Sequence, residues 1–373
     1  MNILIFSWRG PGHPYAGGAE QVTHEHAKAW VKEGHKVFLF TSSYKSTSGN
    51  NTLDGVEIVR KGNQILGVQI AGFLWFSLGK HPKFDLVIDQ FHGIPFFTPI
   101  YVKTKKLAFI HEVAKEVWRL NPWPKPFNLI PYFLGNLFEP LIFRLVYKNT
   151  PFLTGAKSTE DDLVSWGIPR NNITVINHGV ELEDKPKKLP DKNNIKTAIF
   201  LGAVTRDKGI FDALKVFGEI NRKDDSWKFW IVGKAEEHVR KEVRKMIKEL
   251  GIQEKVKLWG FVSNEKKFEL LAKANVMINT SAKEGWGLVN IEANAVGTPV
   301  VAYDVSGCRD SIKNGITGIL VNYGDYRNIA YEAIKLVNDQ AAYSKVQKNA
   351  FSWSNNFSWE KAAKESLKLV ESL

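Results

Sequence analysis

The chain has 373 residues, more than one compact hydrophobic core usually holds, so its length predicts two domains. Its 44% hydrophobic and 24% charged residues are typical of a soluble globular protein and exclude a disordered or fibrous chain. The formal net charge of +12 favours anionic ligands or surfaces. No helix-turn-helix, zinc-finger or RNP pattern accompanies this charge, so we expect no nucleic-acid partner. The single cysteine, Cys308, excludes an intramolecular disulfide and fits a reducing compartment.

The N-terminus leads directly into a strand-like run at residues 2–7, without the basic segment and cleavage site of a signal peptide. Two longer apolar stretches follow. Residues 65–78 are too few to cross a bilayer. Residues 129–147 are interrupted by polar residues and prolines, so we expect no transmembrane helix. The sequence therefore predicts a cytoplasmic protein, with peripheral association with the inner face of the membrane left open. The interrupting residues are Pro131, Asn136, Glu139, Pro140 and Arg144.

In the first half, short β-branched or aromatic runs alternate with longer amphipathic segments, a pattern typical of βαβ units and a parallel sheet. Apolar residues from Ala19 to Val31 recur at helical spacing, and Gly34 is expected to end that helix. This rhythm predicts a Rossmann-like domain over residues 1–180. Its expected strands cover residues 3–7, 37–41, 86–88, 107–110 and 152–154.

A Lys- and Pro-rich segment, residues 181–196, is typical of an exposed linker. The same alternation then resumes and predicts a second Rossmann-like domain over residues 197–358, with a C-terminal helix at 359–373 that packs back on the first domain. The expected fold class is therefore α/β, with two doubly wound parallel sheets and a cleft between the domains. The second set of strands is expected at 198–202, 228–232, 256–258, 276–279, 298–302 and 319–321, with helices at 211–220, 236–250, 265–274 and 288–295.

The first loop, SWRGPGHPYAGGAE, is glycine-rich and must be compared with the dinucleotide-binding pattern G-x-G-x-x-G. Gly10 and Gly12 begin that pattern, but Tyr15 stands at the position of its last glycine. The second strand also lacks an acidic residue at its end. These departures argue against an NAD site. Gly17 and Gly18 then form either a ligand loop or a simple structural turn.

A second loop, FLGAVTRDKGI, follows the first strand of the second half and carries Gly202, Arg206 and Lys208. Two cations on a strand-to-helix turn can neutralise a departing diphosphate. The alternative is a pair of solvated surface charges.

The stretch NTSAKEGWGLVNIEANAVGTPVVA places Glu284 in a loop and Glu292 about one turn inside the following helix. Glycines on both sides of Trp286 allow the backbone close to a ligand, and unpaired amides at a helix start favour an anion. Carboxylates accept hydrogen bonds from sugar and ribose hydroxyls. The combination suits a diphosphate between two sugars; a capped helix with two solvated glutamates is the alternative.

The part EGWGLVNIEANAVGTPVVA is similar to the E-x7-E motif of the retaining family 4 glycosyltransferases, which have the GT-B fold. This resemblance implies that Glu284 contacts the donor sugar and Glu292 the ribose hydroxyls. It also implies that the backbone from Gly285 through Trp286 and Gly287 to Leu288 faces the sugar and the diphosphate.

The resemblance extends to other loops. Lys208 matches a family lysine, whereas Ala203 stands where the family usually has an arginine, and Arg206 is the candidate to replace it. His111, after the fourth strand, matches a histidine that reaches the donor sugar. The remaining matches are the Gly17-Gly18 loop, expected to close over the diphosphate, and the weaker Gly202, Gly233 and Val262 around the nucleotide.

The resemblance implies transfer of a hexose from a nucleoside-diphosphate sugar, UDP favoured over GDP, with retention of anomeric configuration. No D-x-D motif or His/Cys cluster appears, so we expect no divalent metal and no other cofactor. Two alternatives stay open: an epimerase or phosphorylase on the same fold, and a nucleotide-sugar-binding protein without turnover.

Aromatic and basic residues gather in the first half, a mixture typical of lipid interfaces and also of core packing. They favour a lipid-linked acceptor over a soluble glycan, in cell-envelope glycan or glycolipid synthesis. The residues are Phe73, Trp75, Phe76, Lys80, Trp118, Arg119, Trp123, Lys125, Phe133 and Arg144.

Overall fold

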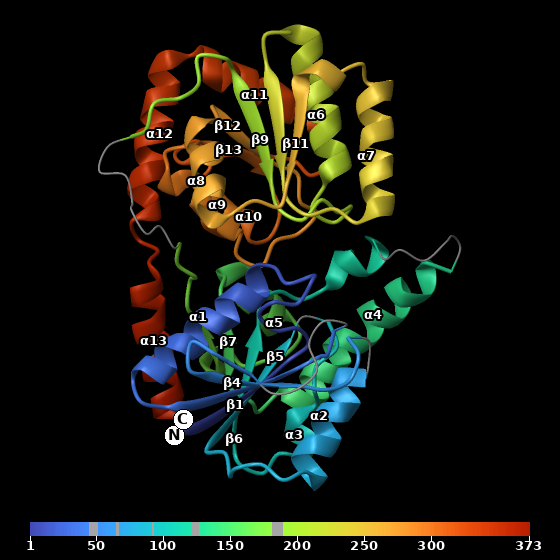
Figure 1. Ribbon diagram of the computed structural model, residues 1–373, viewed down its shortest axis with the longest axis vertical. Helices are drawn as coiled ribbons and strands as arrows, with labels where there is room; N and C mark the ends of the chain where they lie inside the picture. Colours follow the sequence, from blue (N-terminus) through green and yellow to red (C-terminus); the bar gives the residue numbers. More distant parts are fainter. Residues whose placement is uncertain (45–50, 65–66, 92, 121–126, 181–188) are drawn as a thin grey trace. The chain divides into compact units, whose positions relative to one another are not determined.

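The computed structural model describes residues 1–44, 51–64, 67–91, 93–120, 127–180 and 189–373. The chain forms two compact units (Figure 1). Unit 1 comprises Met1–Trp118, Trp123–Gly179 and Trp359–Leu373, and unit 2 comprises Arg119–Pro122 and Val180–Ser358. Each unit is built on its own twisted sheet, as the alternation of short strands and amphipathic segments predicts.

Unit 1 holds an eight-stranded sheet in the order β3-β4-β2-β1-β5-β6-β7-β8. Every neighbouring pair is parallel except β3 and β4, which are antiparallel and close one edge. The sequence did not predict β3, β4 and β8, because runs of three to five residues give too little periodic signal. The strands are β1 (Asn2–Ser7), β2 (Lys36–Thr41), β3 (Asn51–Leu53), β4 (Val56–Arg60), β5 (Leu86–Phe91), β6 (Lys105–Ile110), β7 (Phe152–Thr154) and β8 (Ile173–Val175).

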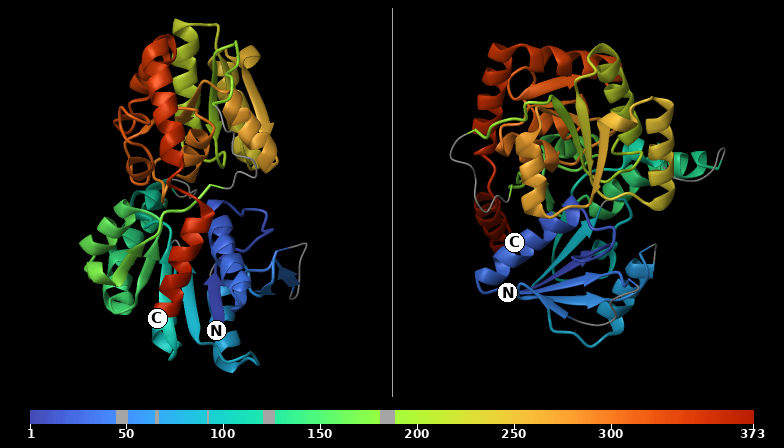
Figure 2. Two further views of the ribbon diagram at one scale, coloured as in Figure 1. Left: turned by 90° about the vertical axis from the view of Figure 1, so that its left-hand side faces the viewer. Right: turned by 45° about the horizontal axis from the view of Figure 1, so that its top comes forward.

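Alternate residues of the central strands of unit 1 face two separate cores, as the period of two requires. Ile3 and Ile5 pack with helices α1 (Gly18–Lys32) and α13 (Trp359–Ser372), which lie side by side in Figure 2. Leu4 and Phe6 face the opposite core, which includes side chains of α2 and α3. The other helices of unit 1 are α2 (Gly67–Leu78), α3 (Thr98–Tyr101), α4 (Leu129–Ile142) and α5 (Lys157–Ser165), with short turns η2 (Phe143–Tyr147) and η3 (Arg170–Asn172); η1 (Lys115–Leu120) runs from unit 1 into unit 2.

Residues 129–147 form a continuous helical segment despite their two prolines. Helix α4 passes through Pro131 and Pro140 and continues as the π-helical turn η2. Pro131 lies in the first turn, where the missing N–H has no partner inside the helix in any case. Among the described residues, Leu129–Tyr147 is the one helix whose length and composition would allow it to cross a membrane, and 11% of its most apolar window is buried.

Unit 2 holds a six-stranded, wholly parallel sheet in the order β11-β10-β9-β12-β13-β14. The strands are β9 (Thr197–Leu201), β10 (Lys228–Val232), β11 (Val256–Gly260), β12 (Val276–Asn279), β13 (Val300–Tyr303) and β14 (Gly318–Val321). The strand order reverses between β9 and β12, and ligands of such sheets bind at the carboxyl ends beside that reversal. Two doubly wound parallel sheets confirm the predicted fold class.

Helices cover the unit 2 sheet and bury apolar stripes against it. Helix α6, for example, buries Ala213, Leu214, Phe217 and Ile220 at helical spacing. The helices are α6 (Ile210–Lys223), α7 (Glu237–Glu249), α8 (Asn264–Lys273), α9 (Leu288–Ala295), α10 (Cys308–Ser311), α11 (Tyr326–Asn338) and α12 (Gln340–Ser354), with the short turn η4 (Gln253–Lys255).

Candidate functional site

The loops after β9 and β12 of unit 2 meet at the reversal of strand order and bring two predicted site residues together. The Nζ of Lys208 lies 2.9 Å from Oε2 of Glu284, with the two side chains 28% and 12% exposed. The residues are far apart in sequence, and the adjacency of β9 and β12 explains the pair. A partly exposed cation and carboxylate therefore stand where this sheet type binds ligands.

Polar contacts fix Glu284 in one position. Ser281 donates its hydroxyl hydrogen to the second carboxylate oxygen at 2.6 Å, and the amide of Glu284 donates to the carbonyl of Ser306 at 3.1 Å. The amide of Ala282 donates to the carbonyl of Asp207 at 2.8 Å, which ties this loop to the one that carries Lys208. The carboxylate is thus held before any ligand arrives, the arrangement that gives hydrogen bonds most of their effect in a site.

Glycines allow the close packing of these loops. Gly209 precedes α6 with φ 75°, and a Cβ there would lie 1.9 Å from the carbonyl oxygen of Thr280. Gly287 precedes α9 with φ 73°, and its Cβ would lie 2.6 Å from Oγ of Ser311. Both positions combine a left-handed backbone with a space that no side chain fits. Gly287 offers no capping side chain, and in the first turn of α9 the amide of Asn290 donates to the carbonyl of Gly287 at 2.9 Å, so the amides of Leu288 and Val289 are the candidates to bind an anion.

Glu292 points to a second lysine. Its Oε1 lies 2.5 Å from Nζ of Lys267 on α8, with side chains 8% and 17% exposed. Lys267 was not predicted from the sequence, because it follows Glu265 and Lys266 in a run of charged residues, and nothing in the spacing separates it from a solvated lysine. Only the packing of α8 against α9 distinguishes it.

Packing also decides which parts of the motif around Trp286 are accessible. The indole of Trp286 is 5% exposed and meets the ring of Phe357 edge to face at 5.0 Å, so it serves the core of unit 2. Gly285 and Leu288 remain partly exposed. Asn290 is buried, where it accepts a hydrogen bond from Asn279 at 2.8 Å. Gly285 and Leu288 are therefore accessible from solvent, whereas the tryptophan ring between them is not.

The carboxyl ends of β9, β10 and β11 also adjoin. The amide of Gly202 donates to the carbonyl of Val232 at 3.0 Å, and that of Gly233 donates to the carbonyl of Gly260 at 2.8 Å. A Cβ on Gly233 would lie 1.7 Å from the carbonyl oxygen of Gly202, so this approach requires glycine. The structure thus places Gly202 and Gly233 in contact, with Val262 two residues beyond β11 and partly exposed.

Arg206 is not brought to the Lys208–Glu284 pair. Its side chain is 59% exposed, forms an ion pair with Glu242 on α7 and lies 4.7 Å from the centre of the Phe211 ring. The sequence alone could not reveal this partner, because Glu242 is one of many charged residues on the exposed face of α7.

In unit 1, the loop after β1 is held by Glu20. One carboxylate oxygen accepts the amide hydrogen of Gly17 at 2.6 Å, and the other lies 2.8 Å from Nε of Arg9. Gly17 is the N-cap of α1 and Gly18 its first residue. This capping arrangement satisfies an amide at the helix start and fixes the course of the glycine loop.

His111 follows β6 in unit 1 and belongs to a group of buried imidazoles. Its Nε2 lies 3.4 Å from Oγ1 of Thr23, and its ring centre lies 5.7 Å from that of His178. Burial lowers the pKa of His178 well below its usual value, with further lowering from His111 and His26. Burial also lowers the pKa of His26 to about 4. His26 and His178 are therefore neutral at pH 7.

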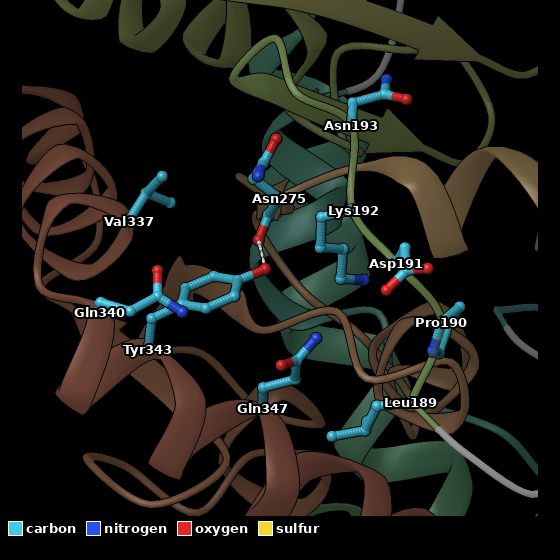
Figure 3. A pocket seen from close by; sticks show the side chains of 10 residues that line it. All are labelled: Leu189, Pro190, Asp191, Lys192, Asn193, Asn275, Val337, Gln340, Tyr343 and Gln347. Atoms are coloured by element: carbon cyan, nitrogen blue, oxygen red, sulfur yellow. Dashed lines mark hydrogen bonds between the residues drawn. The ribbon is translucent and has the colours of Figure 1, made fainter.

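A cavity of about 400 Å³ in unit 2 lies away from these loops (Figure 3). Asn275 and Asn193 come before β12 and β9, so the cavity is at the amino ends of the strands, whereas Lys208 and Glu284 are at the carboxyl ends. In the cavity, the hydroxyl of Tyr343 donates to the carbonyl of Asn275 at 2.8 Å.

The half-buried lysine of this cavity, Lys192, is explained by its contacts. Burial lowers its pKa to about 7. Its ammonium group donates to the carbonyl oxygens of Ala272 and Val296 and to the hydroxyl of Thr298. Three oxygen acceptors satisfy the three donors of the ammonium, so the lysine holds the chain ahead of β9 in place.

The family described as "Glycosyltransferase Family 4" matches residues 16–184, and that described as "Glycosyl transferases group 1" matches residues 181–353. The two matches overlap at residues 181–184 and together include every predicted site residue. The chain is a family 4 glycosyltransferase. As such it uses a nucleotide sugar.

Full-length relatives support this assignment. An uncharacterized glycosyltransferase of Methanocaldococcus jannaschii, MJ1607, is 23% identical, and the match covers 100% of this chain and 98% of that protein. Among solved structures, Anabaena Alr3699/HepE in complex with UDP and glucose has a TM-score of 0.74 at 18% identity, with 100% of both chains covered. WaaG, a glycosyltransferase involved in lipopolysaccharide biosynthesis, has a TM-score of 0.78 at 15% identity, with 98% of this chain and 99% of that chain covered. These structural likenesses establish the GT-B fold of the family 4 enzyme.

In the part of the chain that the structure describes, no group of three or more His, Cys, Asp or Glu residues is arranged to hold a metal ion. Cys308 is buried, and burial raises the pKa of its thiol above the usual range.

Proposed function

We propose that the protein transfers a hexose from a UDP-sugar to an acceptor with retention of anomeric configuration. The observation that carries the proposal is the Lys208–Glu284 pair at the reversal of strand order in unit 2, at 2.9 Å. A cation and the amides at a helix start each suit a diphosphate, and a fixed carboxylate suits the hydroxyls of a sugar. UDP is preferred over GDP because a structural relative, HepE, binds UDP and glucose.

Each residue then has a distinct part. Lys208 neutralises charge on the leaving diphosphate, Glu284 accepts hydrogen bonds from the donor sugar, and Glu292 accepts them from the ribose hydroxyls. Gly202, Gly233 and Val262 adjoin the nucleotide. Arg206 is a further candidate cation for the diphosphate, although its present partner is Glu242. In unit 1, His111 contacts the donor sugar and the Gly17-Gly18 loop contacts the diphosphate, as the family resemblance implies.

The proposed reaction breaks the bond between the sugar C1 and the β-phosphate oxygen, and the acceptor oxygen forms its bond to C1 on the same face. The acceptor hydroxyl proton passes to the departing phosphate. No protein nucleophile and no metal ion enters this scheme. Lys208 is worth most in the transition state, because negative charge on the phosphate grows as the bond breaks.

We infer further that the acceptor is lipid-linked, at the inner face of the cell membrane, in cell-envelope glycan or glycolipid synthesis. WaaG, a relative of the same fold, is involved in lipopolysaccharide biosynthesis. A soluble glycan acceptor is the competing possibility. Activity towards lipid-extracted acceptors, compared with soluble oligosaccharides, decides between them.

A thermal-shift screen with UDP, GDP and their sugars tests the donor, because a ligand that binds only the folded state raises the melting temperature by mass action. We expect UDP-hexoses to give the largest shift, and a transfer assay then to give a product of retained configuration. A shift without transfer or hydrolysis would identify a binding protein, and interconversion of the donor sugar without acceptor would identify an epimerase. Absence of any shift would overturn the proposal.

A further inference from the structure

The exposed face of helix α4 and turn η2 in unit 1 is mostly apolar. Eight hydrophobic residues between positions 129 and 145 are 39% to 76% exposed, which is unusual for side chains of this size. They recur three or four residues apart, so they share one side of the helix. The residues are Leu129, Ile130, Phe133, Leu134, Leu137, Phe138, Leu141 and Leu145.

The other side of this helix is bound to the body of unit 1. Gly135, Glu139, Phe143 and Tyr147 are spaced four apart and form that stripe. Gly135 approaches the Trp118 ring so closely that a Cβ would lie 2.4 Å from it. Phe143 and Tyr147 are 1% and 0% exposed in the core beneath.

Glu139 fastens the middle of the helix. Its carboxylate accepts hydrogen bonds from the amides of Ala114 and Lys115 at 2.7 and 3.1 Å and from the indole of Trp118 at 2.9 Å. A helix that crossed a bilayer would have to give up these bonds and expose this carboxylate to hydrocarbon. The attachment therefore favours a helix that lies on a surface over one that spans it.

The charges around this helix indicate what kind of surface it binds. Between α2 and the end of η2, residues 67–148, the sequence has ten Lys/Arg against five Asp/Glu, and two of the five, Asp89 and Glu139, are buried. Arg144 and Lys148 are exposed and share the apolar side with Leu141 and Leu145. An apolar stripe with flanking cations is complementary to an anionic lipid bilayer.

We propose that the α4–η2 face docks unit 1 on the surface of an anionic phospholipid bilayer, with the helix lying in the interface and its apolar side chains among the lipids. Of the aromatic-basic residues predicted from sequence, Phe133 and Arg144 lie on this face, Trp118 packs beneath it, and Trp123 and Lys125 lie outside the described residues. The docking would bring unit 1 to a lipid-linked acceptor, so its functional role rests on the proposed acceptor. Binding to the bilayer itself does not depend on that proposal.

Sedimentation with vesicles of phosphatidylcholine and phosphatidylglycerol tests the docking. We expect the full chain to bind these vesicles, to bind pure phosphatidylcholine less, and to be released by alkaline carbonate. The double variant Phe133→Glu/Leu137→Glu should bind at least tenfold more weakly. The matched control Ile316→Glu/Tyr331→Glu, at positions 51% and 50% exposed in unit 2, should bind as the unchanged protein does.

Three results would overturn the proposal: no vesicle binding by the unchanged protein, equal losses in both double variants, or retention after carbonate, which would indicate a spanning helix. Self-association without vesicle binding would assign the face to a second copy of the chain. Melting temperatures of the same variants, measured with and without UDP-glucose, check that each variant is folded and test donor binding separately. If UDP-glucose does not raise the melting temperature of the unchanged protein, this counts against the proposed donor and not against the docking.

Discussion

The two units share a doubly wound topology but carry opposite kinds of chemistry. Unit 2 places paired charges at the carboxyl ends of its strands, Lys208 with Glu284 and Lys267 with Glu292. Unit 1 instead buries neutral imidazoles, His26 and His178, and exposes an apolar helix. In both units the sheet supplies positions, whereas the loops and helices that leave it supply function.

The largest loss of stability is expected from substitution of Gly209, which precedes α6 in unit 2. Gly209→Ala combines a left-handed φ of 75° with a Cβ placed 1.9 Å from the Thr280 carbonyl oxygen, and should cost about 3 kcal/mol or more in the free energy of unfolding. Gly251→Ala is the control, since its φ is 66° with nothing within 4 Å, and should cost about 1 kcal/mol. Urea titration compares them; equal losses would show that the loop yields to the extra methyl.

Acid should destabilise unit 1 more than unit 2. Because the folded pKa of His26 is about 4 against 6.5 for the free side chain, the unfolded chain binds more protons between these values, and stability falls as the pH drops through that window. The loss should reach about 2 to 3 kcal/mol by about pH 4.5, in unit 1. Of the nine histidines, His238 alone belongs to unit 2, and it is exposed. Hydrogen exchange measured for each unit checks this; equal loss of protection in both would contradict it.

Removal of the cation at the reversal of strand order should act on turnover. We expect Lys208→Ala to raise the activation free energy by about 2 kcal/mol or more, which lowers kcat roughly thirtyfold or more, with the melting temperature little changed. Lys215→Ala serves as control, because Lys215 also pairs with a carboxylate, Asp212 at 2.8 Å, but on α6. Steady-state kinetics decide the matter, and unchanged turnover in the Lys208 variant would remove its assigned part.

The carboxylate on α9 should act on donor binding instead. Glu292→Ala should weaken donor affinity by about 1.4 kcal/mol, or roughly tenfold, through lost hydrogen bonds to the ribose, and leave kcat nearly unchanged. Calorimetry with the nucleotide alone measures this. A fall in kcat with unaltered affinity would place Glu292 at the reacting sugar.

The smallest effect is expected for Arg206. Its exposed ion pair with Glu242 contributes about 0.5 kcal/mol or less to stability. Arg206→Ala should therefore unfold much as the unchanged protein does, and should lower kcat less than Lys208→Ala. A loss of kcat as large as that of the Lys208 variant would show that Arg206 leaves Glu242 for the diphosphate.

The sequence by itself determined the alternation of strands and helices, and with it two parallel sheets, because β-branched runs and helical periodicity are local properties. It also marked the loops of Glu284, Glu292 and Lys208, because the spacing of a motif along one loop can be recognised without knowing which other residues the loop contacts. Short edge strands such as β3 were missed, since three exposed residues carry no periodic signal.

Only the tertiary structure decided which charges meet. Lys208 and Glu284 pair because β9 and β12 are neighbours, and Lys267 reaches Glu292 because α8 packs on α9. It also decided that α4 continues through Pro140 and that its apolar side faces outward, while Glu139 is drawn inward by two amides and an indole. Contacts between residues distant in sequence depend on how elements pack, and no local pattern encodes that.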